Sequence, residues 1–439
     1  MSSHRNSRIN INSKQSLRSA CRVLCTVCVM AFLSGCSEDG KEPEVPRPLL
    51  VLDTEAIPYL TKNHWIYATD ADGNLLGVQK AVRGEVVTLP NTTHAQKFNL
   101  TIINGSETPD GKTYASILTY ADVESGSTVK GQHGTAGLVL IDPGMVTFKI
   151  TTYDGPAYGM KFTNPGSHLS YTESIESGTL NADIQLCRLP SDVLLTTYRD
   201  GVPVYKMLKN VKDGDHVELD MKRDFTPFEH QRTLDFKGYY SEGTYNEGWV
   251  SGAYLDDTRK FIVFPFTLID TYYLRYTKDW TAHPIIGYVD GFDAYDMRVF
   301  NTQPSGYVEY NKQAIDIEES FNSFKIPTFN FKTFSTDIHH FSFQFSEDFT
   351  HYTAYFRSFS DAHELSWEIH APKGADLNVG DIPYEILAEY PMINPDAFKY
   401  EGCRLTKIVS GDSYKESILR LWPTQSLEHE TYTYSPKFK

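Results

Sequence analysis

Cysteine is scarce in this chain. Of its six cysteines, only Cys187 and Cys403 lie beyond position 36. Two cysteines cannot form a zinc site without histidine ligands, and they cannot provide the dense disulfide framework of small secreted domains. The pair forms either one disulfide in an oxidising compartment or two buried thiols that behave as small apolar side chains. We expect the two thiols.

Positive charge is scarce as well. The first 35 residues hold five of the 41 Lys+Arg and none of the 56 Asp+Glu, so the remaining 404 residues carry a formal charge of −20. Nucleic acids and anionic lipid headgroups both require cationic patches, which excludes them as partners. No apolar run after position 36 approaches the ~20 residues that span a bilayer. Hydrophobic residues still make up 40% of the chain, enough for packed cores, and the length predicts two to four domains.

Familiar catalytic motifs are also missing. Residues 105–113, GSETPDGKT, end like a phosphate-binding loop, but five residues separate the two glycines in place of four. Residues 114–120 then indicate a strand, whereas a phosphate-binding loop opens a helix, so we expect a hairpin. The chain contains no HExxH and no GxSxG, and its many acids do not single out a catalytic pair. We therefore predict no enzyme activity, no cofactor and no metal, with a hydrolase whose site is hidden as the alternative.

Three polar groups leave weaker alternatives open. Residues 70–74, DADGN, have the oxygen density of a calcium loop but lack the glutamate at the twelfth position, so we expect a hairpin turn. The motif DGFDAYD predicts a turn first and a calcium site second, through Asp290, Asp293 and Asp296. Five histidines gather late in the chain and are expected to be scattered, with a metal or haem site as the alternative: His339, His340, His351, His363 and His370.

The N-terminus reads as a targeting segment. Residues 1–22 carry five cations and no acid, and residues 23–33 are apolar apart from one threonine, which is typical of a signal peptide. The tetrapeptide Leu33-Ser34-Gly35-Cys36 resembles the lipobox of bacterial lipoproteins. This resemblance implies cleavage before Cys36 and lipidation of Cys36 with two or three acyl chains, enough for stable membrane attachment. The alternative is an ordinary secretory signal with a chance cysteine.

An acidic stretch follows the cysteine directly. Ser37-Glu38-Asp39 resembles the surface-export signal of Bacteroides-type lipoproteins, which implies an outer-membrane protein that faces the cell exterior. The alternative is a solvated linker with no targeting role. Residues 36–48 are acidic and proline-rich, and we expect an extended tether.

Beyond the tether the sequence predicts strands and turns. Six Asp-Gly dipeptides, which suit tight hairpins, separate short alternating runs such as 98–103 and 146–151. Helices are expected only near 315–324 and 384–390. The pattern predicts an all-β fold of tandem antiparallel β-sandwiches, similar to immunoglobulin or transthyretin domains. Residues 66–89 and 194–219 align as one repeated strand, hairpin, strand, turn and strand. We place the domains at 49–182, 183–335 and 336–439.

The aromatic content of the middle of the chain is unusual. Residues 225–310 hold 21 Phe, Tyr and Trp in 86 positions. Most are explained by sandwich cores, but aromatic rings beside polar groups also bind sugars and protein partners. We predict Trp249, Trp280 and Tyr245 as ligand-binding residues.

The whole chain resembles, by class, Bacteroides-type surface lipoproteins built from tandem β-sandwiches, such as accessory starch-binding lipoproteins. The resemblance implies a non-enzymatic protein that binds a polysaccharide or another extracellular ligand beside an outer-membrane transporter. The alternative is an adhesin, a fimbrial protein or a structural lipoprotein of the envelope, which would bind protein partners.

Overall fold

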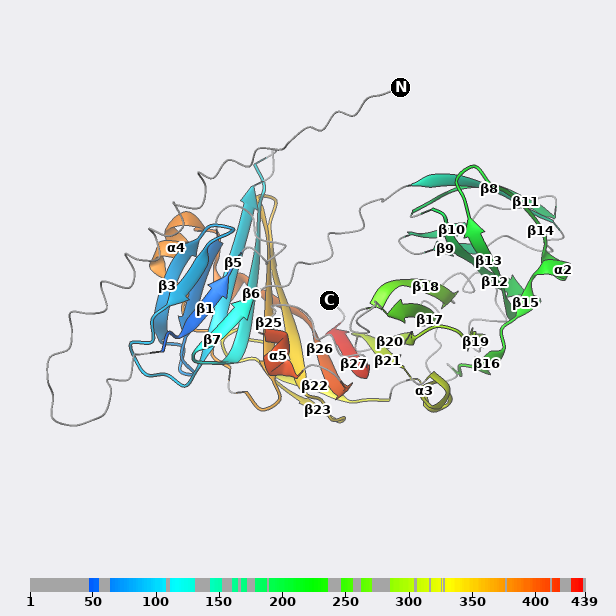
Figure 1. Ribbon diagram of the computed structural model, residues 1–439. Helices are drawn as coiled ribbons and strands as arrows, with labels where there is room; N and C mark the ends of the chain where they lie inside the picture. The colour runs from blue at the N-terminus through cyan, green and yellow to red at the C-terminus, as the bar shows by residue number, and fades with distance from the viewer. Residues whose placement is uncertain are drawn as a thin grey trace, which may run out of the picture. The chain divides into compact units, whose positions relative to one another are not determined.

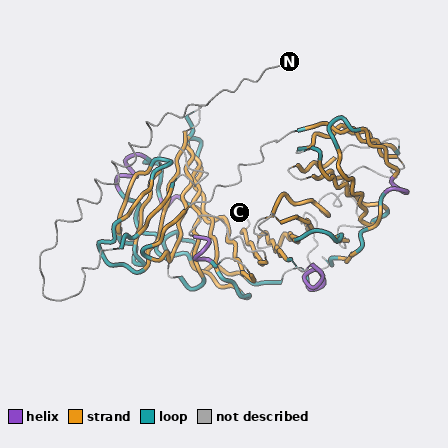
Figure 2. Tube along the Cα trace, viewed as in Figure 1, coloured by secondary structure: helices purple, strands orange, loops and turns teal. Residues whose placement is uncertain are grey.

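Strands dominate the chain, as the sequence predicts, and the helices are short (Figure 2). The structure, a computed structural model, describes residues 47–54, 64–107, 111–130, 143–151, 160–164, 167–171, 178–187, 189–235, 246–255, 262–270, 285–303, 306–315, 317–324, 326, 328–375, 377–410, 413–418 and 428–436. Residues 47–439 form a compact unit of their own, distinct from residues 1–46. Cys36 and the predicted signal peptide lie outside the described residues.

A twelve-stranded sheet joins distant parts of the chain (Figure 1). Its strand order is β18-β17-β20-β21-β27-β26-β24-β25-β6-β5-β2-β3. The bounds are β2 (His64–Thr69), β3 (Leu75–Ala81), β5 (Lys97–Glu107), β6 (Thr113–Glu124), β17 (Asn246–Leu255), β18 (Ile262–Asp270), β20 (Ala294–Gln303), β21 (Gly306–Ala314), β24 (His351–Phe359), β25 (His363–Pro372), β26 (Lys399–Ser410) and β27 (Glu428–Pro436). Neighbouring strands are antiparallel except β6 and β25, which are parallel.

The N-terminal strands of this sheet have a hydrophobic core on each side. Successive side chains of a strand point to opposite sides, so each strand contributes residues to both cores. In β2, Ile66 and Ala68 face a core shared with a three-stranded sheet of β1 (Leu50–Asp53), β4 (Val86–Leu89) and β7 (Ser127–Lys130). Tyr67 faces the opposite core, which also contains Trp367 and Phe398. Around that second core lie a hairpin of β22 (Phe331–Ser335) and β23 (Ser342–Phe345), with α4 (Tyr384–Glu389) and the 3-10 helix η2 (Pro395–Ala397). A further helix, α5 (Tyr414–Ile418), contributes to the first core.

A second pair of sheets encloses a separate core between residues 144 and 227. One sheet has the order β11-β8-β14 and the other β10-β9-β12-β13-β15. The bounds are β8 (Gly144–Thr151), β9 (Met160–Asn164), β10 (Ser167–Tyr171), β11 (Thr179–Leu186), β12 (Ser191–Arg199), β13 (Val202–Val211), β14 (His216–Asp220) and β15 (Thr226–Pro227). Phe148 and Phe162 meet in this core, with ring centroids 4.8 Å apart.

The predicted repeat has the same strand plan in both places. Each copy forms an antiparallel hairpin, β2–β3 or β12–β13, and its third strand then pairs in a different sheet. The turns before β4 and β14 are also alike. The amide of Glu85 donates to the carbonyl of Val82 at 3.1 Å, and that of Asp215 to the carbonyl of Lys212 at 3.2 Å. The sequence similarity therefore corresponds to a shared local fold.

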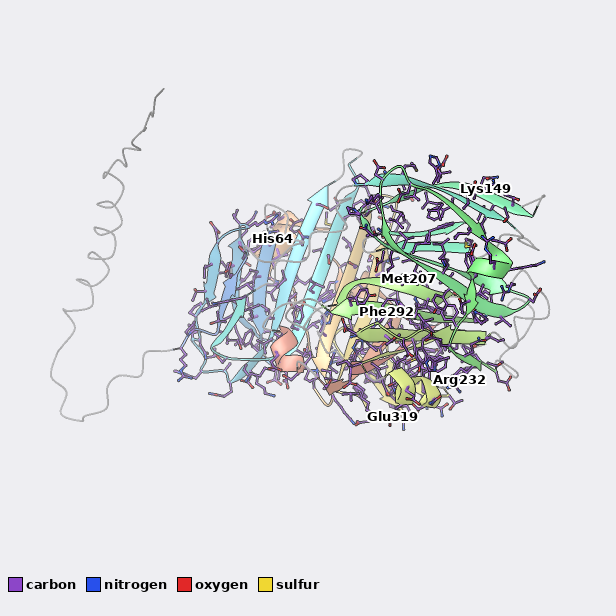
Figure 3. The ribbon with its side chains drawn as sticks, turned by 45° about the vertical axis from the view of Figure 1, so that its right-hand side comes forward. His64, Lys149, Met207, Arg232, Phe292 and Glu319 are labelled. Atoms are coloured by element: carbon purple, nitrogen blue, oxygen red, sulfur yellow. The ribbon has the colours of Figure 1, made fainter. Side chains whose placement is uncertain are left out.

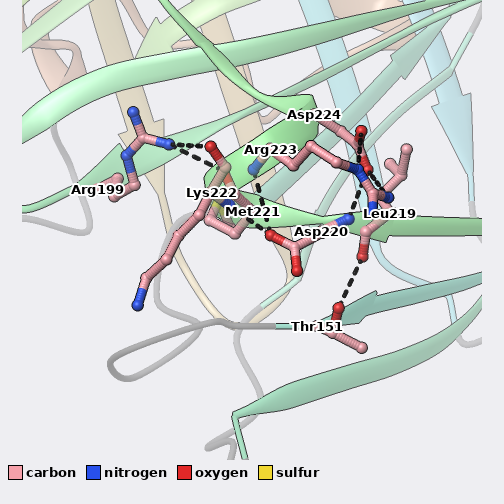
Figure 4. A network of polar contacts seen from close by, with 8 residues as sticks. All are labelled: Thr151, Arg199, Leu219, Asp220, Met221, Lys222, Arg223 and Asp224. Carbon is pink, nitrogen blue, oxygen red and sulfur yellow. Dashed lines mark hydrogen bonds and ion pairs between the residues drawn. The ribbon is translucent and has the colours of Figure 1, made fainter.

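A short helix connects the two sheets that enclose the core between residues 144 and 227. The helix α2 (Met221–Asp224) follows β14 directly, and the Asp220 carboxylate caps it by accepting the amides of Lys222 and Arg223 (Figure 4). Arg199 donates to the carbonyl of Met221 at 2.9 Å, which ties the helix to β12. These bonds use backbone groups that a helix end leaves unpaired.

The middle of the chain has its own core. A two-stranded sheet of β16 (His230–Thr233) and β19 (Ile285–Tyr288) and the helix α3 (Ile317–Ser323) surround Tyr288, Tyr295 and Phe321. Arg232 of β16, labelled in Figure 3, donates to the carbonyls of Phe321 and Asn322 at 2.6 and 3.1 Å. The two predicted helices, 315–324 and 384–390, correspond to α3 and α4.

The hydrogen-bonded sheets divide the chain differently from the predicted domain ranges. Strand β6 of the first range pairs with β25 of the third, and β11 (Thr179–Leu186) contains the predicted boundary at 182. The twelve-stranded sheet therefore includes residues from all three ranges. Both Cys187 and Cys403 are buried free thiols, as we expected.

Candidate functional site

One side of the twelve-stranded sheet, from β17 to β25, is polar. In β20, Met297 and Val299 point into the core, while the alternate residues Asp296 and Arg298 are half-buried on the other side. The same alternation continues through β21, β26, β24 and β25. We call this surface the polar face and define it as Trp249, Ser251, Asp296, Arg298, Glu309, Asn311, Thr353, Tyr355, Glu368, His370 and Arg404.

Strand register places these residues in rows across the sheet. In one row Trp249 is the partner of Arg298, and Arg298 of Asn311. A second row runs from Glu309 through Thr433 to Arg404, and then through Thr353 to His370. Directly paired residues project on the same side of a sheet, so each row presents its side chains together.

The charges on the polar face are partly buried. Arg298 contacts Asp296, with Nη2 and Oδ2 2.9 Å apart. Burial raises the pKa of the Glu309 carboxyl; Arg298 and Arg404 oppose this rise, and Asp296 adds to it. The Arg404 guanidinium lies 5.9 Å from the ring centroid of Tyr355. Carboxylates, guanidinium groups and a phenol ring therefore share one surface.

His370 organises the β25 side of this face. Its Nε2 lies 3.6 Å from the Glu368 carboxylate, and this interaction is the main cause of the lowered pKa of Glu368. Its Nδ1 is 3.0 Å from the Thr353 hydroxyl, and its ring stacks on Tyr120 with centroids 4.9 Å apart. The imidazole is thus fixed on both edges and on one face.

The polar face costs stability compared with an apolar one. Two buried acceptor atoms, Asp296 Oδ1 and Asn311 Oδ1, have no hydrogen-bond partner among the residues that the structure describes. Each such atom costs about 1–3 kcal/mol. The Arg298 and Glu368 side chains, in contrast, remain 43% and 38% exposed. The polar face thus combines unpaired buried oxygens with accessible charged side chains. Proteins retain such unfavourable arrangements mainly at functional sites.

Trp249, one of the three predicted ligand-binding residues, lies on the polar face. Its indole N–H donates to the Ser251 hydroxyl at 3.0 Å. The ammonium of Lys161, a buried residue of β9, is 5.2 Å from the indole centroid. Trp249 is half-buried, so part of its surface remains accessible. Tyr245 and Trp280 lie outside the described residues.

Most described aromatic residues of the middle region belong to the core, as we expected. Phe228, Tyr288, Tyr295 and Tyr310 are all buried in the same cluster. Burial raises the pKa of Tyr295 to about 12, and its hydroxyl donates to the carbonyl of Val289 at 2.8 Å. Trp249 differs from these residues in its half-exposed position.

A polar concavity, separate from the polar face, lies at the turn between β2 and β3. It has a volume of about 370 Å³ and is lined by Asp72, Gly73, Asn74, Asp337, His339, His340, Asn378, Gly380 and Asp381. The Asp70 carboxylate accepts the amides of Asp72 and Asn74 and the Asn74 side chain, so it stabilises the predicted hairpin turn. These bonds lower the pKa of Asp70, although its partial burial acts in the opposite direction.

The other predicted polar groups are dispersed among the described residues. Asp296 is ion-paired with Arg298, whereas Asp290 contacts His230, so the DGFDAYD motif does not converge on one ion. His363 bonds to Ser360, His351 and His370 lie on neighbouring strands, and His339 and His340 line the concavity. Within the described residues, these five histidines form no group of three metal ligands.

Reasoning from sequence did not identify Arg298, Glu309 or Arg404. A signal was present, because YVEYN at 307–311 alternates polar and apolar residues as a half-exposed strand does. The alternation shows that Glu309 leaves the core. It does not show that Arg404, 95 positions away, lies two strands from it.

The chain matches no known protein-family model and no curated protein sequence. Among the described residues, none of the helices has the length and apolar character needed to cross a bilayer.

Proposed function

We propose that this protein is a lipoprotein of the outer cell surface, anchored through Cys36, that binds a glycan on the polar face. The observation that carries the proposal is the composition of that face. It combines half-buried carboxylates, the half-buried guanidinium of Arg298 and the exposed one of Arg404 with the rings of Trp249 and Tyr355. A sugar hydroxyl both donates and accepts hydrogen bonds, and a sugar ring has apolar patches that pack on aromatic rings.

Asp296 and Glu309 are compensated by a cation and are not a free pair of acids, which favours binding over hydrolysis. Asp296 pairs with Gln313, and Glu309 with Phe300, which places them four positions apart along the ladder. Arg298 also lies between the two acids and neutralises part of their charge.

The experiment is a titration of polypeptide 41–439 against a panel of polysaccharides, followed by intrinsic tryptophan fluorescence. We expect a saturable change with one glycan, weakened about tenfold or more in Trp249→Phe and in Arg298→Gln. The matched control is Trp65→Phe. Trp65 is also half-buried, with the Lys80 ammonium 5.6 Å from its ring and its indole N–H bonded to Glu389, but it lies on the opposite side of the sheet.

Binding that is equally strong in Trp249→Phe, Arg298→Gln and the control would place the glycan elsewhere. No response across the panel from a folded protein would contradict the proposal.

An adhesin or envelope structural role is the second candidate. The observation that favours it is β3, the last strand at one end of the twelve-stranded sheet. Its residue Leu75 is 48% exposed. An exposed edge can pair with a strand of another protein. Under this alternative, polypeptide 41–439 captures envelope or host proteins and ignores glycans, and a proline at Val78 abolishes the capture.

A further inference from the structure

Two strand ends bring a histidine and two carboxylates together. Glu229 directly precedes β16, and Asp290 follows β19 by two residues. His230, the first residue of β16, is the antiparallel partner of Tyr288, the last residue of β19. One ligand atom of each of Glu229, His230 and Asp290 lies within 4.8 Å of the others. His230 Nε2 and Asp290 Oδ2 are 3.2 Å apart.

The imidazole is held in place by an aromatic neighbour. The rings of His230 and Tyr288 are stacked, with centroids 4.2 Å apart and planes 8° from parallel. Tyr288 is 2% exposed and contacts Tyr295 and Phe321 edge-on, so it is a fixed support. A stacked ring cannot tilt freely, and its Nε2 therefore keeps its direction toward Asp290. Such pre-orientation is what metal-binding histidines require.

The two carboxylates have no strong cationic partner within the described part of the chain. Neither Glu229 nor Asp290 forms an ion pair there with lysine or arginine; Asp290 pairs only with His230. Arg232, on the same strand, is bonded to the carbonyls at the end of α3. The pKa of Tyr205 is raised by burial and then by the fields of Glu229 and Asp290, which shows that negative potential extends from the pair.

We propose that Glu229, His230 and Asp290 bind a divalent first-row transition-metal ion. Calcium and magnesium prefer oxygen ligands alone, whereas an imidazole nitrogen beside two carboxylates suits zinc and its neighbours in the series. The ligands are accessible, with side chains of His230 and Asp290 39% and 68% exposed, so water completes the coordination. The site is independent of the polar face and of glycan binding.

The test is equilibrium dialysis of polypeptide 41–439 against Zn²⁺, with bound metal measured by mass spectrometry. We expect one equivalent bound at micromolar free Zn²⁺, with affinity reduced about tenfold or more in Asp290→Asn and in His230→Gln. Zn²⁺ should also raise the melting temperature of the parent protein and leave that of both variants unchanged. Asp290→Asn preserves side-chain size at an exposed position, so loss of folding does not explain a loss of metal.

Two control variants separate this site from general binding by the other histidines. Asp293→Asn changes an exposed aspartate of the same loop, and His216→Gln changes an exposed histidine elsewhere. Both should retain the bound equivalent. The proposal is overturned if Zn²⁺ does not bind, or if Asp290→Asn and His230→Gln bind it as the controls do. In that case Asp290 and His230 form a surface ion pair only.

Discussion

The ion pairing and the pKa of each charged residue on the polar face depend on neighbouring charged residues. Burial raises the pKa of Glu309; Arg298 opposes this rise and contacts Asp296, so its removal leaves two acids with less compensation. The pKa of His351, next to this face, is lowered mainly by burial. The alternation along each strand predicts which of these side chains leave the core. Their partners on other strands follow only from register, which short strands of similar composition do not specify.

Replacing Arg298 with glutamine should lower the free energy of unfolding by about 1–2 kcal/mol. Exposed ion pairs contribute about 0–1 kcal/mol, whereas breaking a buried pair costs about 3–5 kcal/mol. The value expected here lies between the two because Arg298 is intermediate in exposure. Urea unfolding measures the change. The control is Arg357→Gln, which removes a looser pair with Glu401 at 3.6 Å and should change stability by less than about 0.5 kcal/mol. Equal effects of the two variants would contradict the assigned role of Arg298.

His351 should make the protein sensitive to acid. Burial lowers the pKa of its imidazole to about 4, with smaller contributions from His370 and His429. Below pH 6.5 the unfolded chain binds a proton that the folded protein does not, so stability is lost as pH falls toward 4. The loss is at most about 1.4 kcal/mol per pH unit.

We therefore expect His351→Phe to reduce the slope of unfolding free energy against pH in this window. The phenyl ring preserves the contact with Tyr414, whose centroid is 5.5 Å from that of His351. The exposed residue His216 provides the comparison, and His216→Phe should leave the slope unchanged. An unaltered slope in His351→Phe would show that other groups cause the acid sensitivity.

At the scale of elements, the turn between β2 and β3 is locked to a distant segment. Asn378 donates to the carbonyl of Asp72 at 2.9 Å, and Asn99 donates to the carbonyl of Asn378 at 2.9 Å. Gly73 and Gly380 meet in this contact. The Asp-Gly dipeptide predicts the turn itself. Nothing local to residues 70–74 predicts residues 377–381 as its partner, because that contact depends on the tertiary fold.

Gly380→Ala should be more destabilising than Gly374→Ala. Both glycines have positive φ, +69° and +80°, so alanine costs about 1–2 kcal/mol at either position. A Cβ at Gly380 would also lie 2.3 Å from the carbonyl oxygen of Gly73, whereas a Cβ at Gly374 has no atom within 4 Å. We expect an additional loss of about 1–3 kcal/mol at Gly380, measured by thermal or urea unfolding. Equal losses would mean that the turn moves freely from its partner.

At the scale of the whole molecule, the sequence predicts the fold class and most strands, but not the joining of distant strands. The runs 98–103 and 146–151 are strands, as period-two alternation indicates. Sequential sandwiches assume that strands pair with near neighbours. Here the C-terminal strand β25 pairs with β6, and strands β7 to β16, which lie between them in the chain, form other sheets. The polar face depends on the pairing of β21 with the C-terminal strand β27, which explains why the sequence identifies Trp249 and misses Arg404.

Trp367 should report on this joining directly. It is fully buried in β25, and its indole N–H donates to the Thr119 hydroxyl in β6 at 2.9 Å. Thr119→Val keeps the shape of that side chain and removes the acceptor, and we expect it to lower stability by about 1–3 kcal/mol. Urea unfolding checks the value, with Thr353→Val as a comparison on the same sheet. A neutral effect of Thr119→Val would indicate that water satisfies the indole.

The parallel pairing of β6 with β25 also sets an order of assembly. The two partners are about 250 residues apart in the chain, so β6 has one free edge during synthesis until β25 has emerged. An open edge in a partly completed sheet invites aggregation, and such distant pairing is slow to form. A nascent chain of this protein therefore needs protection for most of its length, and the docking of β25 on β6 should be a slow folding step, seen as a slow change in Trp367 fluorescence.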